Sequence, residues 1–287
     1  MAARADTRPI ASRWVRRPLK AATRPVVRRI DDALDRRHGV PVPPWSLRSQ
    51  VPGDFRAVGR AFLGYMVDLG GLRPEDRLLD IGCRAGRMTI PLTGYLGPDG
   101  AYDAVDDWPE GTAWCQQVIT TRYPNFRFRQ LSMGGPPPVA GATEATRPAT
   151  PDATAPAPSD ATAPAPEPLP YADATFDFVT LGAILQLTPD AFDWYLAEAA
   201  RVVRPGGTYF GTWFLWNDGR PDTGRPDTGR PNGSRVGTAP AIACTEDEAR
   251  RRLGSLGLTV DVVHRGGWDG YEPSLSHQDL VIARRAQ

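Results

Sequence analysis

The stretch that most constrains the fold is Arg77–Met88, RLLDIGCRAGRM. Its apolar residues at 78, 79 and 81 form a run too short for helical periodicity, which is typical of a strand buried on both faces of a parallel sheet. Gly82 and Gly86 bracket a tight loop after this strand, and a helix is predicted over Arg87–Leu96. Glycines let the backbone approach a ligand closely, and a helix N-terminus offers free N–H donors. The stretch therefore predicts a strand, a ligand-binding turn and a helix.

The loop itself reads DIGCRAG from Asp80, which is expected to end the strand, to Gly86. It resembles motif I of the class I S-adenosylmethionine (SAM)-dependent methyltransferases, an acid followed by G-x-G-x-G, with Arg84 at the central glycine. A nicotinamide- or flavin-binding turn would instead need G-x-G-x-x-G, and counted from Gly82 two of those three glycines are missing. The resemblance implies that SAM is contacted by Asp80, Gly82, Cys83, Arg84 and Gly86.

A second acidic position supports this interpretation. Ala101–Val105 is predicted to be the second strand, ending in Asp106 and Asp107, and Asp106 follows Gly86 by twenty residues. At that spacing a carboxylate at the tip of the second strand can accept both ribose hydroxyls of an adenosine ligand. The alternative is a solvated turn acid. Trp108 is predicted either to pack beside an adenine ring or to staple the following helix, residues 110–121.

The third strand is expected over Phe126–Leu131, because its apolar residues alternate with polar ones. Related methyltransferases often carry an Asp or Asn just after this strand to accept from the adenine amino group. Ser132 stands there in this chain, and a hydroxyl is a weaker acceptor than a carboxylate.

The block after residue 170 carries a second resemblance. Ala174–Gly182 predicts strand four, Thr188-Pro189 opens a helix, and Arg204–Gly207 ends it before strand five, Thr208–Phe214. The string FDFV…LAEAARVVRPGG is similar to the fourth strand, helix and turn of the same methyltransferase family. Gly182, at the end of strand four, is expected to join the cofactor site.

Together these elements predict an α/β fold: a Rossmann-like, doubly wound, mostly parallel seven-stranded sheet with a C-terminal antiparallel hairpin. A helix capped by Asp54 precedes the first strand, and a capping box at Thr245 opens the last helix. The hairpin strands are expected at Leu258–Val263 and Leu280–Arg284. The methyltransferase domain is expected over residues 45–287.

Three segments depart from the domain pattern. Residues 1–44 form a basic arm and linker, and residues 1–40 carry eleven Lys or Arg against four Asp. Its apolar stripe predicts either a contact with a membrane surface or a protein partner, or a solvated arm. Disordered insertions are expected at about 134–170, which repeats DATAPAP, and at 217–238, which repeats GRPDT.

Composition excludes several classes of protein. The three cysteines lack CxxC spacing, and the three histidines are scattered, which argues against a structural metal centre or a disulfide framework. We find no run of eighteen apolar residues and no signal peptide pattern, so a cytoplasmic protein without a transmembrane segment is expected. Beyond the arm the chain is acidic, which argues against nucleic-acid binding.

The resemblance implies methyl transfer from SAM to an unidentified acceptor, which we expect to be a small molecule. No general base is identified; Asp107, Asp190 and His264 are candidates by position only, and Gln186 stands where relatives often carry His. The alternative is a catalytically degenerate binding or scaffold protein. Arg84 allows two hypotheses: its side chain crowds the cofactor, or it points outward or pairs with the SAM carboxylate.

Overall fold

The computed structural model describes residues 42–49, 51, 53–134, 166–182, 187–216, 243–267 and 276–287. The strands are β1 (Arg77–Ile81), β2 (Ala101–Asp106), β3 (Phe126–Gln130), β4 (Phe176–Leu181), β5 (Val203–Trp213), β6 (Leu215–Trp216), β7 (Cys244–Thr245), β8 (Leu258–His264) and β9 (Asp279–Arg285). The helices are α3 (Trp45–Arg48), α4 (Phe55–Asp68), α5 (Thr89–Leu92), α6 (Pro109–Cys115), α7 (Pro189–Val202) and α8 (Glu246–Ser255), with a π-helical turn, η2 (Gln116–Thr120), after α6.

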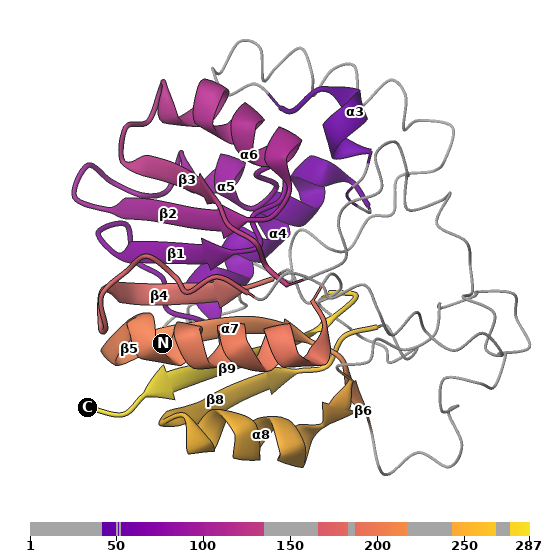
Figure 1. Cartoon of the computed structure of the whole chain (residues 1–287), viewed down its shortest axis with the longest axis vertical. Helices are drawn as coiled ribbons and strands as arrows, with labels where there is room; N and C mark the ends of the chain where they lie inside the picture. The colour runs from indigo at the N-terminus through magenta and orange to yellow at the C-terminus, as the bar shows by residue number, and fades with distance from the viewer. Residues whose placement is uncertain are drawn as a thin grey trace, which may run out of the picture.

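Seven of these strands form one sheet in the order β3-β2-β1-β4-β5-β9-β8 (Figure 1). Neighbours from β3 to β5 are parallel, whereas β9 runs antiparallel to both β5 and β8. The predicted fold class is therefore confirmed. The strand order reverses between β1 and β4, and ligands of open α/β sheets bind beyond the carboxyl ends of the strands at such a reversal.

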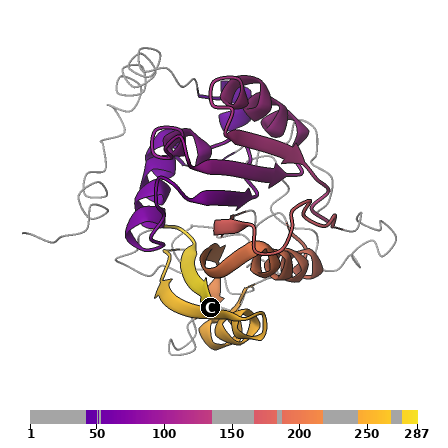
Figure 2. The ribbon, with the colours of Figure 1, turned by 90° about the vertical axis from the view of Figure 1, so that its left-hand side faces the viewer.

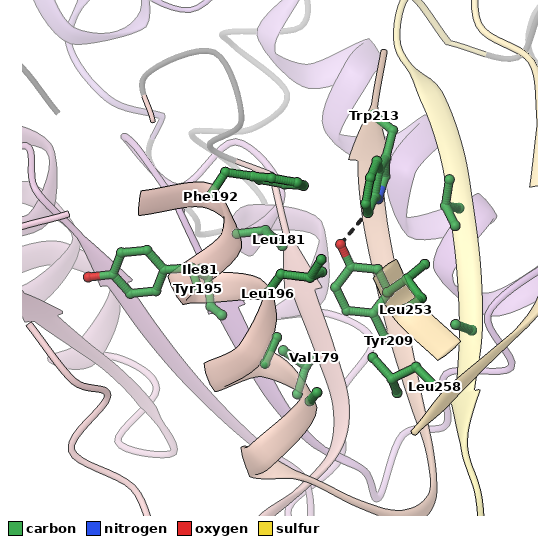
Figure 3. Packing of buried hydrophobic residues seen from close by; sticks show 14 of the residues in the cluster. Ile81, Val179, Leu181, Phe192, Tyr195, Leu196, Tyr209, Trp213, Leu253 and Leu258 are labelled. Atoms are coloured by element: carbon green, nitrogen blue, oxygen red, sulfur yellow. Dashed lines mark hydrogen bonds between the residues drawn. The ribbon is translucent and has the colours of Figure 1, made fainter. Parts of the chain in front are cut away.

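Helices cover both faces of the sheet (Figure 2). Adjacent strand residues point to opposite faces, so Leu78 packs in the core beneath α4, α5 and α6, while Leu79 packs in the core beneath α7 and α8. In the second core Phe192 of α7 meets Trp213 of β5 edge to face, with ring centroids 5.0 Å apart (Figure 3). Trp213 is fully buried and donates to the hydroxyl of Tyr209 at 3.2 Å.

Three helices begin at the side chains predicted to cap them. The Asp54 carboxylate accepts from the N–H groups of residues 56 and 57, and the hydroxyls of Thr188 and Thr245 accept from the N–H groups of residues 191 and 248. Each bond satisfies a backbone donor that the helix itself leaves unpaired. The local signals at these helix starts are confirmed.

Several predicted boundaries were wrong. The regular helix after the loop is α5 alone, because Pro91 lacks an N–H and Gly94 weakens the following turn. Asp80 lies within β1 rather than ending it. Strand β5 begins at Val203, five residues earlier than expected, because Val203 pairs with Phe176 and a bulge follows.

The end of the first predicted insertion is also packed. Leu169, which lies inside the expected disordered segment 134–170, is 3% exposed and belongs to the core beneath α7. The residues that lie outside the described part of the chain include 135–165 of that insertion, the segment 217–238, the arm 1–41, Gln186 and Trp268. The domain division at residue 44 stays a prediction.

Gly59 in α4 lies against the glycine loop. A Cβ at this position would lie 2.3 Å from the carbonyl oxygen of Arg87, whereas one at Gly64 of the same helix would meet nothing within 4 Å. We expect Gly59→Ala to lower the free energy of unfolding by about 1–2 kcal/mol, since overpacking outweighs the helical gain of about 1 kcal/mol. Gly64→Ala should instead raise it by up to about 1 kcal/mol. Equal changes in denaturant unfolding would contradict the close approach.

Candidate active site

The glycine loop, residues 82–88, turns sharply beyond the end of β1. Gly82 has φ 93°, Arg84 φ 53° and Gly86 φ 76°, so three of its first five residues occupy the left-handed region. Backbone bonds hold this shape: the N–H of Gly82 donates to Val105 at 2.8 Å, and that of Gly86 donates to Cys83 at 3.0 Å. The two glycines have the conformation for which glycine is suited. Arg84 adopts it with a Cβ, at a cost of roughly 1–2 kcal/mol.

Asp106, at the tip of β2, touches this loop directly. One carboxylate oxygen accepts from the backbone N–H of Arg84 at 2.6 Å, and the other accepts from that of Trp108 at 2.8 Å. The side chain is only 1% exposed. The loop and the acid that the sequence placed twenty residues apart are therefore brought together at the carboxyl edge of the sheet.

The Arg84 side chain covers this acid. Its guanidinium carbon lies 4.6 Å from the centre of a Trp108 ring, and Nη1 lies 3.8 Å from Asp106 and 3.9 Å from Asp107. Both distances are at the outer limit of an ion pair. The guanidinium therefore lies over the loop and the two carboxylates and does not point outward.

Trp108 is buried and packs with Val51, Phe55 and Ala85, between α4 and the start of α6. Of the two roles predicted for it, this packing supports the staple. Asp107 retains a side chain that is 22% exposed. Burial raises the pKa of Asp107, and the positive charge of Arg84 opposes that rise.

Gly182 and Ser132 lie at the same edge. The N–H of Gly182 donates to Ile81 at 3.1 Å, and a Cβ on it would meet the Met88 methyl group at 3.2 Å. Ser132 follows β3, where its N–H donates to Glu167 at 3.1 Å and its carbonyl accepts from Tyr195 at 3.1 Å. Gly182 therefore borders the loop, and Ser132 lies one strand beyond Asp106.

Asp80 and Cys83 face the interior instead. Asp80 is 1% exposed, and its oxygens accept from Tyr102 at 2.6 Å and from Thr180 at 2.8 Å. Burial raises the pKa of Cys83 well above its ordinary value, so the thiol stays protonated. The Asp80 carboxylate thus lies beneath the loop and supports it.

One residue of this site was missed from the sequence. Gly111 of α6 lies against the loop, and a Cβ there would lie 2.9 Å from the carbonyl oxygen of Arg84 and 2.6 Å from the Trp108 ring. A glycine inside a helical segment costs stability relative to alanine, and that cost was the available signal of a close approach.

The three candidate bases lie in different parts of the fold. Asp107 is the candidate that contacts the loop; Asp190 is exposed on the first turn of α7, and His264 ends β8. Burial lowers the pKa of His264. Trp213, near the end of β5, is a core residue.

The described residues contain neither a metal-ligating cluster of His, Cys, Asp or Glu nor a helix long and apolar enough to cross a membrane.

The pKa of Asp106 is raised above the ordinary value of an aspartate. Burial raises its pKa to about 6, against the opposing charge of Arg84 and the two backbone N–H bonds. Because the folded state then binds the proton more tightly than the unfolded state, protonation of Asp106 stabilises the fold as pH falls from about 6 to about 4. Relative to Asp106→Asn, the free energy of unfolding of the wild type should rise by about 1–3 kcal/mol between pH 7.5 and pH 4.5. A constant difference in urea unfolding would contradict the raised pKa.

Comparison with known proteins agrees with this geometry. Residues 79–211, a little under half of the chain, match the family described as "Methyltransferase domain". The demethylmenaquinone methyltransferase of Bacillus mycoides is 27% identical over 136 residues, which are 47% of this chain and 44% of that protein. The alignments span less than half the length of the curated relatives they match.

Solved structures show the same fold. A chain from the complex between the Haloferax volcanii Trm112 methyltransferase activator and a protein assigned as a methyltransferase superposes with a TM-score of 0.53, at 14% identity, over 85% of this chain and 95% of that one. The [4+2]-cyclase SpnF superposes with a TM-score of 0.50, at 15% identity, over 86% and 98%.

Residues 79–211 therefore form a methyltransferase domain. The resemblance to a methyltransferase family that was stated from the sequence is thus confirmed over these residues.

Proposed function

We propose that this protein is a SAM-dependent methyltransferase with a small-molecule acceptor. One observation carries the proposal: at the reversal of strand order, the Asp106 carboxylate binds the backbone of the glycine loop at 2.6 Å. The residues proposed to border the cofactor are Gly82, Arg84, Gly86, Asp106, Asp107, Ser132 and Gly182. Asp80 and Cys83, which face the interior, are proposed to support the loop from beneath.

The residues at this edge fit an adenosine-containing ligand. A carboxylate has about four lone-pair sites, and backbone N–H groups take two of those on Asp106, which leaves acceptors for ribose hydroxyls. Arg84 covers the remaining sites through long contacts. Its guanidinium must move for the hydroxyls to reach Asp106, so these contacts oppose binding.

The chain contributes to the reaction mainly by alignment. SAM, when bound, supplies an activated methyl group. Correct placement of two reactants can account for roughly 7–11 kcal/mol of a barrier. The loop backbone and Asp106 would orient one reactant, and a base is needed only for an acceptor that keeps a proton on its nucleophilic atom. Asp107 is the titratable candidate beside the loop.

The experiment is an assay with methyl-labelled SAM and a panel of small molecules. Demethylmenaquinone belongs in the panel, because the relative from Bacillus mycoides is named for it. We expect a labelled product that is absent with Asp106→Asn. A protein that binds SAM tightly yet labels no member of the panel would oppose the proposal.

That second outcome would favour a methyltransferase-fold protein that binds a ligand without transferring a methyl group. Arg84 over Asp106 is the specific observation for it. The likeness to a protein named as a [4+2]-cyclase shows that this fold is compatible with another named activity. Binding without labelling separates the two candidates.

A further inference from the structure

The glycine loop is tied at both ends through one buried hydroxyl. Tyr102, on β2, donates from its hydroxyl to Asp80 at 2.6 Å, and its oxygen lies 2.7 Å from the hydroxyl of Thr89. Asp80 lies two residues before the loop, and Thr89 is the first residue of α5 after it. Since a tyrosine hydroxyl carries one hydrogen, which is given to Asp80, Thr89 must donate to Tyr102.

The hydrogen bonds of Tyr102 and Asp80 extend to a third strand, and packing holds the Tyr102 ring in place. Asp80 accepts from Thr180 of β4 at 2.8 Å, so the hydrogen bonds cross from β2 through β1 to β4. The Tyr102 ring stacks on Phe126 with centroids 5.1 Å apart and an interplanar angle of 23°. All of these groups are buried, and buried hydrogen-bonded networks fix geometry because each alternative arrangement leaves a polar group unpaired.

The loop needs such support, because Arg84 holds a positive φ although it carries a Cβ. Strained backbone persists only where its surroundings hold it. Burial raises the pKa of Tyr102 well above its ordinary value, so the hydroxyl keeps its proton and remains a donor.

We propose that Tyr102 is a positioning residue: its hydroxyl, bridging Asp80 and Thr89, sets the spacing of the two loop ends and so aims the loop backbone at the ligand. Tyr102 does not itself contact the ligand, because its hydroxyl is buried and forms hydrogen bonds with Asp80 and Thr89. The effect on affinity rests on the proposed SAM site, whereas the effect on the loop does not.

The test compares Tyr102→Phe with Tyr209→Phe. Tyr209, on β5, is also fully buried, and its hydroxyl accepts one side-chain hydrogen bond, from Trp213, but it lies in the core beneath α7. Amide hydrogen exchange of residues 84–88 and calorimetric affinity for SAM are measured, together with global unfolding. We expect Tyr102→Phe to speed exchange in the loop and weaken SAM binding, each at least tenfold, and Tyr209→Phe to change neither beyond its effect on global unfolding.

Thr89→Val supplies the second variant, because it removes the link to α5 and leaves the bond between Tyr102 and Asp80. It should also speed loop exchange, even if Tyr102→Phe folds poorly. Loop exchange that is unchanged in Thr89→Val would overturn the proposal. Faster loop exchange in a protein whose wild type does not bind SAM would uphold the positioning role and reject the SAM site.

Discussion

Arg84→Gly is expected to bind SAM about tenfold more tightly than the wild type. Binding must displace the guanidinium from Trp108 and from two carboxylates. A partly exposed cation–π contact is worth about 0.5–1 kcal/mol and a weak ion pair about 0.2–1 kcal/mol, so removing them should recover roughly 1.4 kcal/mol, which is tenfold in affinity. Isothermal titration calorimetry measures this change.

Arg84→Ala is the matched control. It removes the same contacts but keeps a Cβ in the left-handed conformation, so it should bind SAM as tightly as Arg84→Gly. In denaturant unfolding it should be less stable than Arg84→Gly by about 1 kcal/mol. Weaker binding by both variants would show instead that Arg84 helps to hold the cofactor, as the pairing hypothesis requires.

Asp106→Asn is expected to lower the affinity for SAM by a hundredfold or more. Hydrogen bonds to a charged acceptor are worth about 1.5–3 kcal/mol each, and in the variant two ribose hydroxyls would meet one neutral amide oxygen in place of two charged carboxylate oxygens. The substitution is nearly isosteric. One backbone N–H of Arg84 or Trp108 loses its acceptor, but the cost of burying a charge disappears, so the protein should remain folded.

Asp103→Asn is the control for this change. Asp103 is equally buried in β2, but it lies away from the loop and pairs with Arg77 at 3.4 Å. Its substitution should leave SAM affinity within the error of the wild type. Equal losses for Asp103→Asn and Asp106→Asn would mean that β2 as a whole, and not the acid at its tip, determines binding.

The fold was predictable because its signals are local and repeated. The apolar run before Gly82 and the caps at Asp54, Thr188 and Thr245 each predicted an element that the structure contains. The predicted strand boundaries were wrong where pairing with a residue far away in the sequence determines where the strand begins. Val203 joins β5 because Phe176 lies opposite, a contact that no pattern within either segment reveals.

The meeting of the loop with the acid of the second strand was predictable, but the geometry of that meeting was not. The spacing between Gly86 and Asp106 correctly brought the loop and the second-strand acid together. The direction of the Arg84 side chain depends on Trp108 and Asp107, which lie beside it only in the folded chain. The bond between Tyr102 and Asp80 depends likewise on the register of β1 and β2.

The close approaches to the loop were not predictable either. Gly59 and Gly111 both looked like unfavourable residues within helices. Glycine is needed at both positions because the carbonyl oxygen of Arg87 leaves no room for a Cβ at Gly59, and that of Arg84 leaves none at Gly111.

The central claim is that the glycine loop and Asp106 form a SAM site. Calorimetric titration of the folded full chain with SAM and with S-adenosylhomocysteine tests it most directly. Micromolar binding of both ligands, lost in Asp106→Asn and retained in Asp103→Asn, is the result we predict. Absence of binding at millimolar ligand, in the wild type and in Arg84→Gly alike, would contradict it.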